Sequence, residues 1–294
     1  MSAISERVRA LFKQGDDVRD AGLATPDDVI RHDDLIYGSD EKWQRLDLYR
    51  PRRDEGKDLP VIVSIHGGGW VYGDKERYQY YCMSLAQRGF AVVNFTYRLA
   101  PEFKWPSPLE DTNLVMSWVL ENAQEYHLDT KHLFAVGDSA GGHMLALYID
   151  FLTNPEYAAQ FAFRAPAGMS LQAAALNCGV YDMPEHLDEK DMTGLLMKDF
   201  LKDGGTPEEL RMISPIRHMT DQFVPCFVMS ATDDFLSSQL PGMVQALIAH
   251  HVPFEAHFYG TAENRLPHVF HCNMRSEDAR ICNDDECAYF RRFC

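Results

Sequence analysis

The sequence predicts an α/β fold, in which a mostly parallel central sheet carries helices on both faces. Short apolar runs rich in β-branched residues alternate along the chain with longer segments in which apolar residues recur at helical spacing. The run at 61–65 is almost continuously apolar, which is typical of a strand buried on both faces. No repeat or flexible linker divides the chain, so we expect a single domain over residues 1–294.

The expected strands are bounded by turn residues or by the start of a helix. The first two are short and compatible with an antiparallel edge, and Pro51 and a polar loop follow them. Later runs lead into a glycine-rich turn or a helix, as repeated strand–helix units do. In chain order the expected strands are 35–37, 46–49, 61–65, 91–97, 132–136, 173–178, 223–230 and 254–259.

The expected helices fill the segments between these strands. One or two amphipathic helices are expected in 1–30, and regular helices at 76–89, 108–126, 140–153, 237–251 and 279–292. Residues 183–220 break the rhythm, with short helical patterns, five methionines and the pair Gly204-Gly205. We interpret 183–220, with or without 1–30, as a small cap inserted into the domain.

The composition excludes several classes of partner. With 28 Lys+Arg and 44 Asp+Glu, the formal net charge is −16, and no basic block is present to bind nucleic acid or anionic lipid. No apolar run approaches the roughly 18 residues of a membrane span. The charged N-terminus has no secretory pattern. We therefore expect a cytoplasmic protein that binds neither nucleic acid nor membrane, and a homodimer is compatible with the sequence.

The cysteines do not predict a disulfide framework or a metal site. There are seven of them, an odd number at irregular spacing, and no CxxC pair occurs. We expect reduced thiols, no metal and no cofactor.

Ser139 is the candidate nucleophile. The sequence Gly137-Asp138-Ser139-Ala140-Gly141 fits G-x-S-x-G between an expected strand and an expected helix. Such a turn is strained, and small residues two before and two after the serine avoid a clash. The helix that follows places the serine where its dipole favours developing negative charge.

The segment His66-Gly67-Gly68-Gly69 follows an earlier strand and is the candidate oxyanion loop. Glycines allow successive N–H groups to point at one position, where they stabilise the oxyanion of a tetrahedral intermediate. We assign the N–H groups of Gly67, Gly68 and Ala140 to this role, and we interpret His66 as a loop anchor. No GK[ST] follows, so a phosphate-binding P-loop is excluded.

The serine needs a base, and the base needs an acid to orient it. In this type of fold the chain order is serine, acid, histidine. Asp233 and Asp234 follow strand 223–230, and Asp182 follows strand 173–178. His268 and His271 follow strand 254–259. The spacing alone favours Asp234 and His268 only slightly over these alternatives.

The motifs together resemble those of the hormone-sensitive lipase group of α/β-hydrolases. The matching residues are HGGGW at 66–70, YRLAPE at 97–102 and GDSAGG at 137–142, and LDLYRP at 46–51 is similar to the feruloyl-esterase and kynurenine-formamidase branch. The resemblance implies a cofactor-independent serine esterase. It also implies that the acid is Asp234, in D-x-L, and that the base is His268. The usual H-G-F of the family reads His268-Val269-Phe270 here.

These inferences predict a carboxylesterase that cleaves short-chain acyl esters of a small molecule, of the acetyl-ester type, with a carbohydrate or an aryl alcohol as the other half. An aryl-formamidase with the same triad and a non-catalytic ligand-binding protein on the same scaffold are the alternatives. Five aromatic residues next to the catalytic loops are candidates for the substrate pocket: Trp70, Tyr72, Tyr181, Phe235 and Phe270.

Overall fold

A computed structural model describes residues 2–188 and 190–294. Met1 and Glu189, which fall within the predicted cap ranges 1–30 and 183–220, lie outside the described residues. The strands described form one sheet in the order β1-β2-β4-β3-β5-β6-β7-β8. They are β1 Val29–Ile36, β2 Arg45–Pro51, β3 Leu59–Ile65, β4 Ala91–Phe95, β5 Leu128–Asp138, β6 Leu171–Asn177, β7 Cys226–Ala231 and β8 Phe254–Tyr259.

The sheet is parallel except at one edge. β1 pairs antiparallel with β2, and β2 pairs antiparallel with β4. From β4 to β8 each neighbouring pair is parallel. The α/β class that the sequence predicted is therefore confirmed, and the first two strands form the antiparallel edge with which their pattern is compatible. In such sheets ligands bind at the carboxyl ends of the parallel strands.

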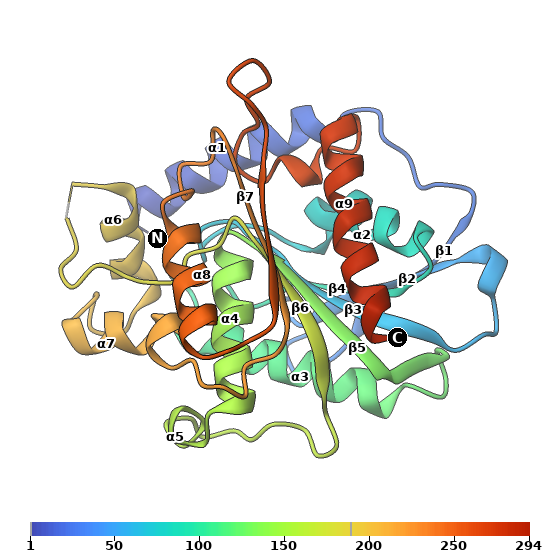
Figure 1. Cartoon of the computed structure of the whole chain (residues 1–294), viewed down its shortest axis with the longest axis horizontal. Helices are drawn as coiled ribbons and strands as arrows, with labels where there is room; N and C mark the ends of the chain where they lie inside the picture. Colours follow the sequence, from blue (N-terminus) through green and yellow to red (C-terminus); the bar gives the residue numbers. More distant parts are fainter. Residues whose placement is uncertain (1, 189) are drawn as a thin grey trace.

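Helices cover both faces of the sheet (Figure 1). The side chain of Ile62 belongs to a buried cluster with α2 and α9, whereas Val61 and Val63 belong to a second cluster with α3, α4 and α8. This alternation follows from the two-residue period of a strand. The helices are α1 Ala3–Asp20, α2 Lys75–Gln87, α3 Ser107–Glu121, α4 Ala140–Thr153, α5 Pro155–Ala158, α6 Met192–Phe200, α7 Pro207–Met212, α8 Gln239–Ala249 and α9 Glu277–Phe290.

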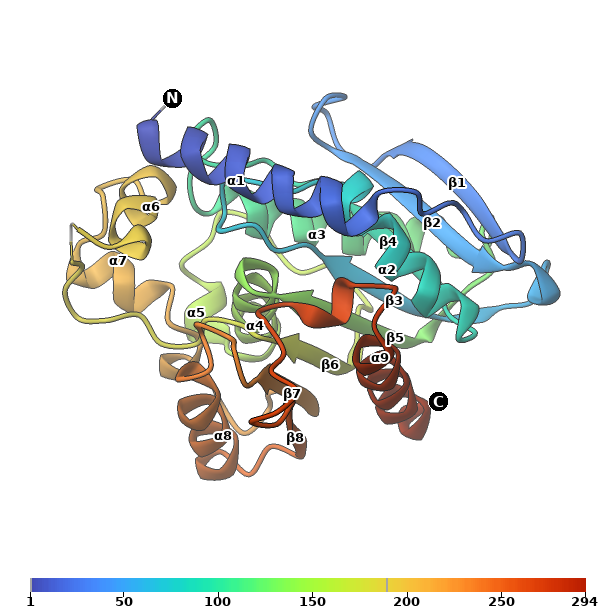
Figure 2. The same ribbon diagram turned by 90° about the horizontal axis from the view of Figure 1, so that it is seen from above.

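The two segments predicted as a cap lie at the same end of the molecule. α1 runs across the carboxyl-terminal side of the sheet, and its first turns approach α6, with α7 beside α6 (Figure 2). Of the one or two helices expected in 1–30, the described residues form one, because Gly22 takes a positive φ of 76° after α1 and β1 begins at Val29. None of the described helices combines the length and the apolar character needed to cross a bilayer.

Candidate active site

Ser139 lies at a sharp turn between a strand and a helix. β5 ends at Asp138 and α4 begins at Ala140, so Ser139 alone connects them. Its backbone angles are φ 52° and ψ −120°, a conformation that residues other than glycine rarely adopt. Ser139 lines a cavity of about 410 Å³. The serine that the motif singled out therefore has the strained backbone that a nucleophile on such a turn requires.

Close backbone contacts explain the glycines on either side of Ser139. A Cβ on Gly137 would lie 2.5 Å from the carbonyl oxygen of Gly141. A Cβ on Gly141 would collide with the carbonyl oxygen of Ile65 and lie 2.7 Å from that of His66. Gly137 therefore has no room for a side chain because the turn folds back on itself, and Gly141 has none because it packs on the end of β3.

His268 and Asp234 form a short hydrogen bond. The Nδ1 of His268 donates to Oδ1 of Asp234 at 2.6 Å. Asp234 also accepts from the hydroxyl of Ser230 at 2.7 Å and from the amide of Leu236 at 2.8 Å, which fixes its carboxylate. Burial raises the pKa of Asp234, but the hydrogen bond and charge of His268 outweigh this effect and leave the pKa below its ordinary value.

His268 and Ser139 line the same cavity. The hydroxyl of Ser139 makes no hydrogen bond within residues 2–188 and 190–294. Hydrogen bonds of catalytic groups are often long without substrate and tighten when it binds. The cavity therefore contains a serine and a histidine, and the Nδ1 of this histidine is bonded to an ionised carboxylate.

The other candidate acids have different partners. Asp233 forms an ion pair with Arg265 on the surface. Asp182 pairs with Arg217 at 2.8 Å. Of the three aspartates left open by the spacing, Asp234 is the one that contacts the histidine.

The other histidines near the motifs are buried. His271 is fully buried, and burial lowers its pKa to about 3. His66 is also fully buried, stacks on Tyr97 with ring centroids 4.0 Å apart, and has a pKa lowered by burial to about 4. Neither lines the cavity of Ser139. The burial and stacking of His66 fit its predicted role as an anchor of the loop.

The expected role of Gly67 as an oxyanion donor conflicts with its hydrogen bond. The N–H of Gly67 donates to the hydroxyl of Tyr78 at 2.9 Å, and this hydroxyl donates to Asp138 at 2.7 Å. An N–H engaged in this way cannot also point at the oxyanion. Burial raises the pKa of Asp138 to about 6, although the hydrogen bond from Tyr78 acts in the opposite direction.

Three other N–H groups near Ser139 have no recorded acceptor in the described part of the chain. They belong to Gly68, Gly69 and Ala140. Gly68 has φ +120° and Gly69 has φ +60°, so this stretch of the loop needs glycine to adopt its course. Without Gly67, the loop still has free N–H donors that could bind the oxyanion. The sequence did not indicate Gly69 as a donor, because the three glycines of the motif are equivalent in sequence.

The cavity is walled by eight separate stretches of the described chain. α1 and α6 supply residues that no local motif indicated, and Tyr78 comes from α2. The lining comprises Leu11, Phe12, Gly15, Asp16, Arg19, Gly67, Gly68, Gly69, Trp70, Tyr72, Tyr78, Asp138, Ser139, Val180, Met192, Thr193, Leu196, Phe235, Leu236, His268 and Val269.

Two of the five aromatic pocket candidates do not line this cavity. The hydroxyl of Tyr181 accepts the N–H of Gly179 at 3.1 Å, which turns the ring into the core. Phe270 is buried against Tyr259, with ring centroids 5.4 Å apart. Both were included because they adjoin catalytic loops in sequence, and side-chain direction cannot be read from that.

Trp70 connects the oxyanion loop to the region of α7. Its indole N–H donates to Nδ1 of His143 at 3.0 Å, and Nε2 of His143 lies 2.6 Å from the carbonyl oxygen of Ile213. Burial lowers the pKa of His143 to about 4, so the ring is neutral and donates through Nε2. The three groups fix the backbone of the loop beside the helical segment.

Comparison with known proteins agrees with this geometry. The model of the family BD-FAE matches residues 46–239, from β2 through the nucleophile turn to the start of α8. The chain belongs to the BD-FAE family. The resemblance inferred from the motifs is therefore confirmed.

Two curated relatives of this BD-FAE protein are named as ester-cleaving enzymes. The probable carboxylic ester hydrolase LipM of Mycobacterium tuberculosis is 30% identical over 248 residues, which cover 79% of this chain and 57% of LipM. Esterase LipC of the same organism is 29% identical over 208 residues, which cover 68% of this chain and 50% of LipC. The chain thus spans about half the length of the curated relatives it matches.

A solved structure matches the BD-FAE chain over nearly its whole length. Esterase B from Lactobacillus rhamnosis superimposes with a TM-score of 0.89 at 25% identity, over 99% of this chain and 97% of that one. The 99% coverage extends beyond residues 46–239, the range that the family model matches. The α/β-hydrolase fold is therefore shown for the whole described chain.

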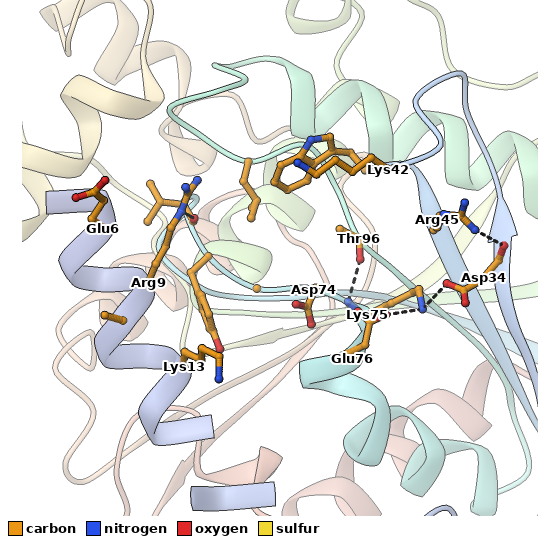
Figure 3. A pocket seen from close by; sticks show the side chains of 16 residues that line it. Glu6, Arg9, Lys13, Asp34, Lys42, Arg45, Asp74, Lys75, Glu76 and Thr96 are labelled. Carbon is orange, nitrogen blue, oxygen red and sulfur yellow. Dashed lines mark hydrogen bonds and ion pairs between the residues drawn. The ribbon is translucent and has the colours of Figure 1, made fainter. Parts of the chain in front are cut away.

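A second cavity of the BD-FAE protein, of about 660 Å³, also has Tyr72 in its lining. Figure 3 shows this second cavity with its charged side chains. Lys75 is buried beside it, and its ammonium lies 2.8–3.1 Å from carboxylate oxygens of Asp34, Asp47 and Glu76. No serine, cysteine or histidine is among the described residues that line it. It therefore offers no pair of nucleophile and base.

Among residues 2–188 and 190–294 of this BD-FAE protein, two groups of three side chains could hold a metal ion. One comprises Asp138, His271 and Cys272, and the other Cys178, Asp234 and His268. The carboxylates of both groups already accept hydrogen bonds from protein donors. We assign no metal to either group.

Proposed function

We propose that this protein is a serine carboxylesterase that cleaves short-chain acyl esters through an acyl-enzyme intermediate. One observation carries the proposal: the strained Ser139 faces the cavity that also receives His268, whose Nδ1 is held by Asp234. The names of the relatives support ester cleavage.

The proposed mechanism begins with proton transfer from Ser139. As its oxygen attacks the carbonyl carbon of the ester, Nε2 of His268 takes the proton, and Asp234 stabilises the imidazolium that forms. The oxyanion of the tetrahedral intermediate accepts hydrogen bonds from Gly68, Gly69 and Ala140. His268 then protonates the leaving alcohol, and the acyl group remains on Ser139.

Water completes the cycle. His268 takes a proton from a water molecule, which attacks the acyl-enzyme, and the second tetrahedral intermediate releases the carboxylic acid. Proton transfer back to Ser139 restores the resting state. No step needs a group from outside the chain other than the ester and water.

We include α1 and the segment 183–220 in the proposal as a cap. Leu11 and Phe12 of α1, and Met192 and Leu196 of α6, form part of the cavity wall. In this proposal the four side chains shield the reacting groups from water.

Kinetics on nitrophenyl esters test the proposal. We expect Ser139→Ala to lower kcat/KM for nitrophenyl acetate by at least about a thousandfold. A fluorophosphonate probe should label Ser139 in the folded wild-type protein and leave Ser139→Ala unlabelled. Equal rates for both proteins, with no labelling, would show a ligand-binding protein instead.

Two substrate comparisons test the finer parts. A nitrophenyl ester series from acetate to decanoate should show its highest kcat/KM at short chains, and a maximum at ten carbons would contradict the short-chain assignment. An aryl formamide compared with the matching aryl acetate should be the poorer substrate. The reverse order would favour a formamidase.

A further inference from the structure

Three exposed apolar side chains meet at the mouth of the cavity of Ser139. Leu11 of α1 is 57% exposed, Met192 of α6 is 39% exposed, and Phe235 after β7 is 62% exposed. They are among the eight large apolar side chains exposed in the described part of the chain, and all three line this cavity. Exposed apolar groups that gather from separate elements around a cavity are typical of a site that binds an apolar ligand.

Phe235 lies against the imidazole of His268. The ring centroids are 4.3 Å apart, with the planes tilted by 46°. In serine hydrolysis the histidine delivers its proton to the oxygen of the leaving group. A side chain that packs on this imidazole is therefore next to the alcohol half of the ester, whereas the acyl half is bonded to Ser139 during the reaction.

We infer that Phe235, with Leu11 and Met192 at the same mouth, binds an apolar alcohol group of the substrate, an aryl alcohol above all. The inference rests on the proposed esterase function and names the substrate class of that site. An exposed phenylalanine ring gains most from another ring, which stacks on it in an offset or edge-to-face arrangement. Such a site favours aryl esters over acetylated carbohydrates, whereas the sequence alone favours neither substrate class.

The polar side chains of the wall are largely engaged with one another. Asp16 accepts the hydroxyl of Tyr72 at 2.8 Å and pairs with Arg19 at 2.9 Å. Tyr78 and Asp138 are joined by their own hydrogen bond of 2.7 Å. A sugar ring entering this mouth would find few unpaired side-chain partners besides Thr193, and burying its other hydroxyl groups without partners is unfavourable. An aryl group needs no such partners.

The test compares leaving groups across three variants. kcat/KM is measured for phenyl acetate, ethyl acetate and acetylated xylose with wild type, Phe235→Ala and Phe235→Tyr. Phe258→Ala is the matched control, because Phe258 on β8 is 57% exposed and does not line the cavity. We expect Phe235→Ala to lower kcat/KM for phenyl acetate by about five- to tenfold and that for ethyl acetate by less than about twofold.

Phe235→Tyr should retain the wild-type ratio of the two rates, since it keeps the ring, and Phe258→Ala should change neither rate. The effect of Phe235→Ala should be the same for phenyl acetate and phenyl butyrate, because the acyl half is not in contact with this ring. Wild type should hydrolyse phenyl acetate with a higher kcat/KM than acetylated xylose.

Several results would overturn the inference. An equal loss on phenyl and ethyl acetate would show that Phe235 only positions His268. A loss that varies with the acyl chain would place Phe235 on the acyl side, and a preference for acetylated xylose would exclude the aryl class. In each case the rates would still depend on Ser139. If Ser139→Ala and wild type hydrolyse every ester at the same rate, the esterase proposal itself has failed.

Discussion

The hydroxyl of Tyr78 donates a hydrogen bond of 2.7 Å to the carboxylate of Asp138, the residue directly before Ser139. The same hydroxyl accepts the N–H of Gly67 at 2.9 Å. Both side chains are buried. Through this one hydroxyl, the loop that carries the free N–H donors is tied to the turn that carries the nucleophile.

Tyr78→Phe removes the hydrogen bonds of this hydroxyl to Asp138 and Gly67 and leaves the ring in place. We expect kcat for nitrophenyl acetate to fall by about ten- to a hundredfold, because the loop no longer holds its donors at the position of the oxyanion, with KM changed less than about threefold. Tyr80→Phe on the same helix is the control, since its hydroxyl donates to the carbonyl oxygen of Leu23 outside the cavity. A wild-type kcat in Tyr78→Phe would show that the Tyr78 hydroxyl does not position the N–H donors of the loop.

Asp234→Asn tests which acid orients the base. The amide cannot accept the Nδ1–H of His268 as the carboxylate does, so the ring loses the tautomer that catalysis needs. We expect kcat to fall by about ten-thousandfold. Asp233→Asn and Asp182→Asn should keep nearly full activity, because these residues pair with arginines away from His268. A large loss in Asp233→Asn with little loss in Asp234→Asn would reverse the assignment.

The sequence was sufficient for the parts of the fold whose patterns are local. The central strand β3 and the helix α4 lie where continuous apolar and helical patterns predicted them. The edge strand β1 covers Val29–Ile36 instead of the predicted 35–37. Its register shifts between His32 and Leu35, where Asp34 has a positive φ of 59°. Such an irregular, polar edge strand shows no clear alternation in sequence.

In the candidate site, too, the residues that a local pattern determines were predictable and those that depend on distant contacts were not. Ser139 was predictable because the steric needs of its turn fix the residues two positions away on each side. The role given to Gly67 was wrong because Tyr78, which engages its N–H, belongs to no motif. Val269 adopts the left-handed conformation, φ 52° and ψ 33°, at the position where the family usually has glycine. The surrounding packing therefore imposes a backbone that local preference disfavours.

Glu286→Gln should make the stability of the protein less dependent on pH. Glu286 is fully buried, and its carboxylate accepts hydrogen bonds from Tyr81 at 2.9 Å and Asn177 at 2.7 Å. Burial raises its pKa from 4.5 to about 7, although both hydrogen bonds act against this shift. Between these two pH values the folded protein holds a proton that the unfolded chain has lost, so stability falls as pH rises.

The glutamine variant removes this dependence. At pH 8 we expect Glu286→Gln to unfold with a free energy up to about 3 kcal/mol higher than wild type, and at pH 4.5 to show little difference. The Asn177 amide has an unpartnered Oδ1, so it can turn to accept the new N–H group. Urea unfolding at both pH values measures the effect. Glu277→Gln on the exposed side of α9 should show no such gain, and an equal gain there would contradict the assignment.

Gly141→Ala and Gly242→Ala should have opposite effects, although both replace a helical glycine. Alanine is favoured over glycine in a helix by about 1 kcal/mol, and a Cβ on Gly242 meets no atom within 4 Å, so Gly242→Ala should raise the free energy of unfolding by about 0.5–1 kcal/mol. A Cβ on Gly141 collides with the carbonyl oxygen of Ile65. We expect Gly141→Ala to lower the free energy of unfolding by more than about 3 kcal/mol and to abolish fluorophosphonate labelling. Thermal unfolding compares the two, and a Gly141→Ala protein as stable as wild type would show that the turn and β3 are not in contact as described.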